Sequence, residues 1–123
     1  MSLTRNPDDL VVKEIFSKSI QRAKRWHKGA IDDWNLLEWA GAMCGEAGET
    51  ANLAKKLRRV EMGLVGQGSK DVEEYRKLIA KEACDTILYA VLVIASTGCP
   101  DPEQLLRDVF NDKSREFDFP ERI

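Results

Sequence analysis

The chain has 123 residues, of which 43% are apolar and 33% are charged, and its formal net charge is −2. This length fits a single domain over residues 1–123, and the nearly balanced charge gives no indication of a nucleic-acid partner. The three cysteines are too few and too widely spaced for a CxxC zinc or redox motif, and their odd number argues against a disulfide framework.

The N-terminal residues are charged and contain no apolar stretch of the kind that secretory signals carry. The longest apolar run, residues 87–95, is about half of what a membrane-spanning helix requires. We therefore expect a cytoplasmic protein with no membrane partner.

The first half of the chain predicts two helices. The first is expected to begin at a cap provided by Asp8 or Asp9 and to end near residue 26. Asp32 or Asp33 is then expected to cap a longer helix over residues 34–60.

The second half predicts two more helices after a connection. Three glycines in residues 63–69 indicate a flexible loop. A third helix is predicted over residues 72–96, ended by Thr97-Gly98. A fourth is predicted from Pro102 to about residue 117, with Asp101 as its cap.

No segment alternates apolar and polar residues with a period of two, so strands are not expected. The fold class is therefore all-α, most simply a four-helix bundle with two long central helices. The second half of the third helix is apolar on all sides, which is typical of a helix buried on several faces. We expect a subunit interface there and hence a homo-oligomer.

Two pairs of acids lie within the two central helices. Glu46 is expected inside the apolar arc of the second helix and Glu49 at its border, while Glu82 and Asp85 lie on the third helix. The apolar face of the second helix is predicted to consist of Leu36, Trp39, Met43, Ala47, Ala54 and Leu57. Two glycines beside the first pair, Gly45 and Gly48, suggest the close approach of another backbone.

The acidic pairs need compensation if they are buried. An unpaired ionised carboxylate in a dry interior costs several kcal/mol, and the apolar arcs around these acids contain no Lys or Arg. One ExxE pair alone is common on solvated helices, but two acidic pairs on separate helices favour a cation site. Oxygen ligands favour Mg²⁺, with Mn²⁺ as a possible substitute. His27 is the only histidine, which excludes the two ExxH motifs of di-iron bundles.

These pairs, Glu46-Ala-Gly-Glu49 and Glu82-Ala-Cys-Asp85, resemble the ExxE…ExxD signature of the all-α nucleoside triphosphate pyrophosphohydrolases, specifically the MazG-like branch. The resemblance covers residues 26–115. It implies a MazG-like four-helix bundle that forms dimers or tetramers, with helices packing across subunits. It also implies Mg²⁺-dependent hydrolysis of a (d)NTP to the monophosphate and pyrophosphate, with the four acids as metal ligands. The housecleaning of nucleotide pools is the role we expect.

Two features depart from the family pattern. Many relatives carry a further acid just before each pair, where this chain has Gly45 and Lys81. The stretch between the pairs is also long for the family, and the extra length falls largely in the glycine-rich loop. Both departures leave open which base or sugar is preferred.

Further residues are candidates for catalysis or substrate binding. Glu46 or Glu49 could orient or deprotonate the attacking water. Trp26 or Trp34 could stack on a base, although helical aromatic residues more often pack in a core. The cations that could hold the triphosphate are Lys55, Lys56, Lys113 and Arg115, and their alternative is an exposed structural role.

Two alternatives to this function stay open on the sequence. One is a non-catalytic nucleotide-sensing or helical interaction module that keeps the acids for metal-linked folding. The other is a relative with a narrower substrate, such as a dUTP or dCTP pyrophosphatase or a phosphoribosyl-ATP pyrophosphohydrolase.

Overall fold

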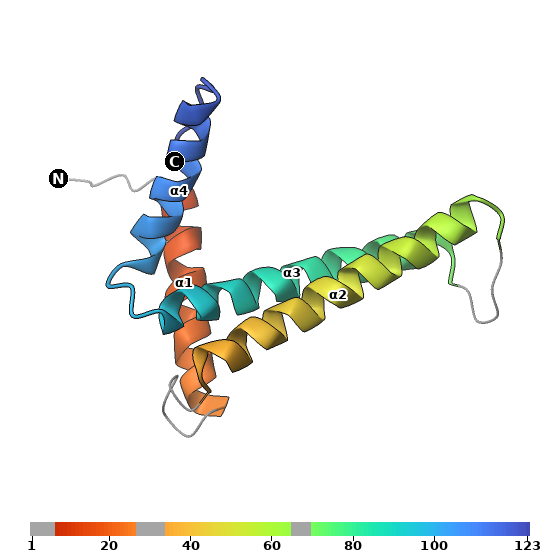
Figure 1. The fold of residues 1–123 in the computed structure, drawn as a ribbon, viewed down its shortest axis with the longest axis horizontal. Coiled ribbons are helices and arrows are strands. Elements are labelled where there is room, and N and C mark those ends of the chain that lie inside the picture. The colour runs from red at the N-terminus through yellow and green to blue at the C-terminus, as the bar shows by residue number, and fades with distance from the viewer. Residues whose placement is uncertain (1–6, 27–33, 65–69) are drawn as a thin grey trace. The chain divides into compact units, whose positions relative to one another are not determined.

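The computed structural model describes residues 7–26, 34–64 and 70–123, and this part of the chain contains four helices and no strand. They are α1 (Pro7–Trp26), α2 (Leu36–Glu61), α3 (Val72–Ser96) and α4 (Pro102–Glu116) (Figure 1). The predicted all-α class is confirmed, and all four predicted helices are present. The prediction that Asp8 or Asp9 caps the first helix is wrong, because α1 begins at Pro7 and includes both residues. None of the described helices is both long enough and apolar enough to cross a membrane.

The chain divides into two compact units. One contains α1 and α4, which contact each other, and the other, Trp34–Val93, contains α2 and most of α3. The acidic pairs of both central helices lie in the second unit, so that unit alone determines the geometry of the candidate site.

Side-chain caps fix where three of the helices begin. Asn35 caps α2, because its side-chain oxygen accepts a hydrogen bond of 2.9 Å from the Glu38 amide. The prediction of Asp32 or Asp33 as this cap is therefore wrong; both lie outside the described residues, and the helix begins later than predicted. Asp71, which was not predicted as a cap, caps α3 because its side-chain oxygen accepts a hydrogen bond of 2.8 Å from the Glu74 amide.

The start of α4 and the end of α3 agree with the prediction. Asp101 accepts a hydrogen bond of 3.1 Å from the Gln104 amide, and Pro102 occupies the first turn, where a missing N–H has no cost. Gly98 has a φ of 81°, a left-handed conformation that glycine adopts without strain and that ends α3. The predicted glycine-rich connection covers residues 63–69, of which residues 65–69 lie outside the described part of the chain.

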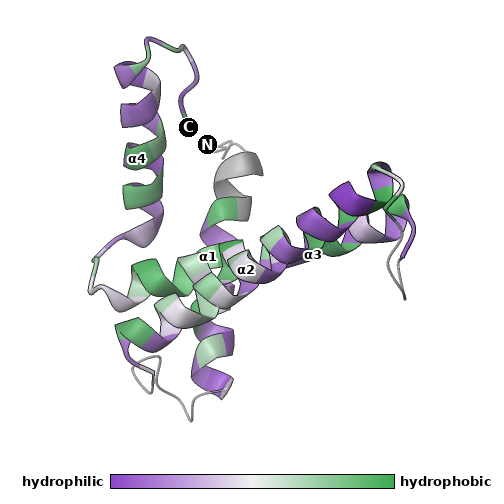
Figure 2. Cartoon of the chain, turned by 45° about the vertical axis from the view of Figure 1, so that its right-hand side comes forward, coloured by the Kyte–Doolittle hydropathy of each residue, from purple (hydrophilic) through white to green (hydrophobic). Residues whose placement is uncertain are grey.

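The second unit is an antiparallel pair of helices, in which α2 and α3 lie side by side along their length in both views (Figures 1 and 2). Buried and half-buried side chains recur in steps of three and four residues, the spacing of a coiled-coil seam. On α2 this seam consists of Trp39, Met43, Glu46, Thr50, Leu53, Leu57 and Val60. On α3 it consists of Val72, Tyr75, Ile79, Glu82, Thr86, Tyr89 and Val93.

The seam corrects the predicted apolar face of α2. Leu36, Ala47 and Ala54 are exposed. Glu46, which was expected inside the apolar arc, lies in the seam, and so does Thr50, which was not expected there. The reason is geometric: a stripe that starts at Trp39 and keeps facing a partner helix must step by three or four residues, and these steps reach Glu46 and Thr50. The prediction relied on hydropathy and therefore placed Ala47 and Ala54 on the buried face, whereas their neighbours Glu46 and Leu53 lie there.

Aromatic packing anchors one end of the helix pair. Trp39 is 1% exposed, and its ring lies 4.7 Å from that of Trp34 and 6.3 Å from that of Tyr89, measured between centroids. Hydrophobic residues are concentrated toward this end of the pair, whereas the end near the connecting loop is largely hydrophilic (Figure 2). The acids lie between these two ends.

The buried residues of the first unit include small and polar side chains as well as apolar ones. Phe16, Ser19 and Ala23 form the buried stripe of α1. On α4 the Arg107 guanidinium pairs with Glu103 at 3.0 Å, and both side chains are largely buried.

The Asn35 cap gives a first test of the fold. Replacing an N-cap asparagine with alanine typically costs about 1 kcal/mol, so Asn35→Ala should lower the free energy of unfolding by about that amount. Chemical denaturation monitored by circular dichroism measures the change. Asn52→Ala, at an exposed position inside α2, is the matched control and should have little effect. Equal effects of the two substitutions would contradict the assigned cap.

Candidate metal centre

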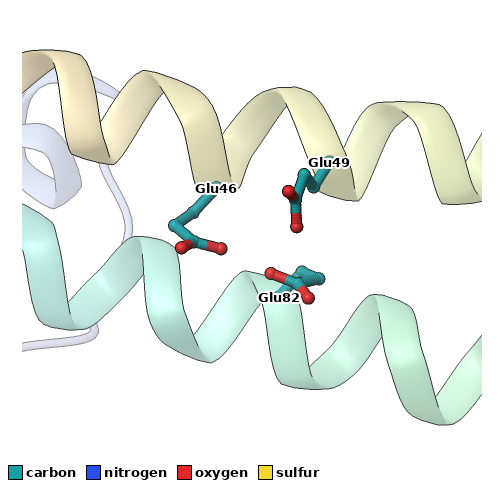
Figure 3. A group of neighbouring side chains, drawn as sticks. All are labelled: Glu46, Glu49 and Glu82. Atoms are coloured by element: carbon teal, nitrogen blue, oxygen red, sulfur yellow. The ribbon is translucent and has the colours of Figure 1, made fainter.

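Three glutamates converge where α2 faces α3. Glu46 and Glu49 extend from α2, Glu82 extends from α3, and their carboxylates point toward one another (Figure 3). One oxygen from each lies within 4.8 Å of those from the other two. We call these three residues the glutamate cluster. The sequence predicted that these acids would meet, and the structure brings three of the four together.

The degree of burial differs among the acids. Glu82 is 9% exposed, Glu46 and Asp85 are half-buried, and Glu49 is exposed. The expectation that all of the acids would be kept dry is therefore correct for Glu82 alone. A cluster that is buried at its base and open at Glu49 remains accessible to solvent and to a ligand.

Asp85 is not part of the glutamate cluster, and it pairs with a lysine. The Lys81 ammonium lies 2.9 Å from an Asp85 oxygen and 3.5 Å from Oε1 of Glu82. The prediction that no cation would lie near these acids is wrong. Lys81 directly precedes the second acidic pair, and its long side chain extends along the helix to the acids that follow it. This side chain is 65% exposed. A helical wheel places the Cα of a lysine but not its ammonium.

The other oxygen of Glu82 is buried and has no hydrogen-bond partner. Such an atom costs free energy unless a proton or a cation satisfies it. A proton on the neighbouring Glu46 offsets part of the cost of burying the Glu82 carboxylate, because the pKa of Glu46 is raised to about 7. The main cause is a hydrogen bond to Glu82 that Glu46 can donate only when protonated, followed by burial and by the negative charges of Glu82, Asp85 and Glu49.

The donor set fits a hard divalent cation. All of the convergent atoms are carboxylate oxygens, the ligands that Mg²⁺ and Mn²⁺ prefer. Around Mg²⁺, oxygens at about 2.1 Å from the ion are separated by about 3 Å when adjacent and by about 4.2 Å when opposite. The observed separations of up to 4.8 Å are therefore within reach of small rotations of exposed or half-buried side chains. A cation would take the place of the proton that Glu46 and Glu82 share.

Two threonines in the seam were not identified from the sequence. Thr50 donates a hydrogen bond of 2.9 Å to the carbonyl of Glu46, and Thr86 donates one of the same length to the carbonyl of Glu82. Each hydroxyl is satisfied within its own helix, so neither competes for the carboxylates.

The threonines reveal a short internal repeat that would have located them. Residues 46–50 read Glu-Ala-Gly-Glu-Thr and residues 82–86 read Glu-Ala-Cys-Asp-Thr. Because the two helices run antiparallel, the repeat places equivalent residues on both sides of the seam. The residue before each copy differs, with Gly45 on α2 and Lys81 on α3.

The glycines of α2 do not accommodate a close neighbour within this chain. A Cβ built on Gly45 or Gly48 would have no described atom within 4 Å. The expected close approach of another backbone is therefore not found within the described chain, and both positions can accept a side chain.

The two candidate tryptophans are placed differently. Trp34 packs against Trp39 at the aromatic end of the helix pair, which is a core role. Trp26 is the last residue of α1 and is 67% exposed, and the Arg22 guanidinium lies 5.5 Å from the centre of its ring. His27 lies outside the described residues.

The candidate phosphate-binding cations are exposed and lie in both units. Lys55 and Lys56 follow the glutamate cluster on α2. Lys113 and Arg115 lie on α4, in the other unit, where they pair with Glu116 at 3.3 Å and with Asp112 at 2.7 Å. Both of these pairs are exposed, so they are easily exchanged for other partners.

Comparisons of the chain with family models, with curated proteins and with solved structures found no match.

The raised pKa of Glu46 predicts how stability depends on pH in the metal-free protein. The pKa rises from 4.5 to about 7, so the folded protein binds more protons than the unfolded chain between these values. The stabilisation from protonated Glu46 is fully present below pH 4.5 and is lost as the pH rises through about 7.

Glu46→Gln should remove this dependence, because an amide donates to Glu82 without ionising. In a chelator at pH 8 we expect the variant to melt several degrees above the unmodified protein, with the difference nearly absent at pH 5. Thermal melts monitored by circular dichroism measure both. Glu14→Gln, at an exposed position on α1, should melt like the unmodified protein at either pH. A constant difference between Glu46→Gln and the unmodified protein across the pH range would contradict the shared proton.

Proposed function

We propose that this protein is a Mg²⁺-dependent nucleoside triphosphate pyrophosphohydrolase of the MazG-like type, which converts a (d)NTP into the monophosphate and pyrophosphate. The observation that carries the proposal is the glutamate cluster, in which two facing helices direct three carboxylates at one point and leave a buried Glu82 oxygen without a partner. The resemblance of the two acidic pairs to the ExxE…ExxD signature adds the reaction class.

The residues that would hold the metal are Glu46, Glu49 and Glu82, with Asp85 as the fourth ligand. When bound, Mg²⁺ neutralises charge on the triphosphate and lowers the pKa of a coordinated water. Glu82 is the most buried of the acids and would serve as a fixed ligand. Glu49 is the exposed member, so its carboxylate can also contact the attacking water and orient it.

The position of Glu46 suits it to proton transfer. Glu46 is half-buried and faces Glu49 and Glu82. An oxygen of its carboxylate that stays off the metal can accept the proton that the attacking water loses. The exposed lysines Lys55 and Lys56 follow on the same helix and are proposed to contact the phosphates.

Substitution of the acids tests the proposed activity. Glu49→Gln and Asp85→Asn each preserve size while removing a negative charge, and each should lower Mg²⁺-dependent pyrophosphate release by at least about a hundredfold, beyond the loss typical of residues that support a ligand. The measurement is pyrophosphate release from a panel of (d)NTPs, which also identifies the preferred base and sugar. Glu61→Gln, at an exposed position near the end of α2, should retain activity. Full turnover in both acid variants would overturn the mechanism.

The proposal includes a homo-oligomer, because α3 presents apolar surface that is exposed among the described residues. Ile87 is 58% exposed on the apolar half of that helix. We expect light scattering at micromolar concentration to give a dimer or tetramer, and Ile87→Glu to shift it toward monomer. Lys77→Glu, on the polar half of α3, should leave the oligomer intact. A monomer for the unmodified protein would contradict this part of the proposal.

A helical module that binds no metal is the second candidate, and it differs in this respect from the metal-linked module expected from the sequence. The raised pKa of Glu46 favours it, since a proton on Glu46 can stabilise the contact with Glu82 without a cation. The two candidates differ in a calorimetric titration with Mg²⁺. The module predicts no binding and no pyrophosphate release from any nucleotide in the panel. The pyrophosphohydrolase predicts both.

A further inference from the structure

Lys81 stands out among the charged residues of the second unit because its ammonium contacts two of the four candidate ligands. It lies 2.9 Å from Asp85 and 3.5 Å from Glu82. A lysine ammonium is charged at neutral pH. A positive charge is thus already present where the proposed metal would bind.

We propose that Lys81 is a built-in counter-cation that holds Asp85 out of the glutamate cluster and competes with a divalent cation for Asp85 and Glu82. This inference rests on the proposed metal site. A divalent cation that recruits Asp85 must displace the ammonium, which then becomes free to contact an anionic ligand such as a phosphate group.

The internal repeat supplies a comparison within the same structure. Glu49 and Asp85 occupy equivalent positions in the two copies, yet Glu49 belongs to the cluster and Asp85 does not. The residue four positions earlier is Gly45 on α2, which has no side chain, and Lys81 on α3, which pairs with Asp85. No cation of the described residues forms an ion pair with Glu49. The copy of the repeat that is preceded by a lysine is therefore the copy whose second acid, Asp85, lies outside the glutamate cluster.

Displacement of Lys81 is physically feasible. The pair is an i,i+4 contact in which the lysine precedes the acid, which is the weaker of the two orientations on a helix. The lysine side chain is 65% exposed, so its ammonium can return to solvent without a large change in hydration. A divalent ion surrounded by several carboxylates interacts more strongly with Asp85 than a single exposed ammonium does.

The test is the affinity for Mn²⁺ alone, measured by electron paramagnetic resonance at neutral pH and fixed ionic strength, without nucleotide. Lys81→Met removes the competing charge and should bind Mn²⁺ about tenfold more tightly, a factor in keeping with the loss of a neighbouring charge near a protein surface. Lys77→Met removes the same charge one turn earlier on α3, where the lysine pairs with Glu73 at 3.7 Å, and so controls for net charge. Lys81→Gln provides a second, polar replacement.

The reverse substitution is available on the other helix. Gly45→Lys would place an ammonium four residues before Glu49, and a side chain there meets open space. This variant should bind Mn²⁺ several-fold more weakly than the unmodified protein. Gly41→Lys, which also has open space, is its matched control and should bind nearly normally.

The outcomes separate this inference from the proposed function. Tighter binding by both Lys81 variants, with Lys77→Met close to the unmodified protein and Gly45→Lys weaker, supports it. Measurable binding that is equal in the Lys81 and Lys77 variants overturns the inference and leaves the metal site intact. An absence of Mn²⁺ binding in all of the proteins overturns both.

Discussion

The structure of the second unit depends on the contact between Glu46 and Glu82 across the seam of α2 and α3. A coiled-coil seam is normally apolar at these positions, and two facing carboxylates repel each other when both are ionised. The helices can pack there only if a positive charge or a proton lies between them. In the metal-free protein, protonation of Glu46, whose pKa is raised to about 7, and the Lys81 ammonium provide that compensation.

The rest of the helix pair makes this polar contact tolerable. Trp39 and Tyr89 pack together at one end of the seam, and apolar side chains continue the seam toward the connecting loop. This packing brings the helices together at positions other than those of the acids. The unfavourable contact is therefore imposed by the geometry of the pair, which is how proteins commonly create a site with unusual protonation behaviour.

The short repeat explains why the site is nearly symmetric and where the symmetry fails. Glutamate and threonine recur at equivalent places on both helices, and both threonines bond to the backbone of their own helix. The second acid of each copy differs in its surroundings, because Lys81 has a side chain that reaches Asp85 and Gly45 has none. One half of the site is thus open to solvent, and the other half is already neutralised in part.

The sequence determined the four helices, the cap at Asp101, the end of α3 at Gly98 and the pairing of acids on the two central helices. These features follow from local signals: capping residues, proline, glycine and the spacing of charged residues along a single helix. The acids were also expected to meet, because both pairs lie among apolar residues that must be buried.

Only the tertiary structure decided which acids meet and how each is compensated. The register between two helices depends on the packing of whole side chains, so Thr50 lies in the seam and the expected Ala47 does not. Which acid a lysine contacts likewise depends on the rotamer of its side chain, which the spacing of residues does not specify. Lys81 pairs with Asp85, so the four acids, which were predicted as equivalent ligands, are not equivalent in the structure. Local signals act within one helix, whereas burial and charge pairing depend on the distances that arise when two helices come together.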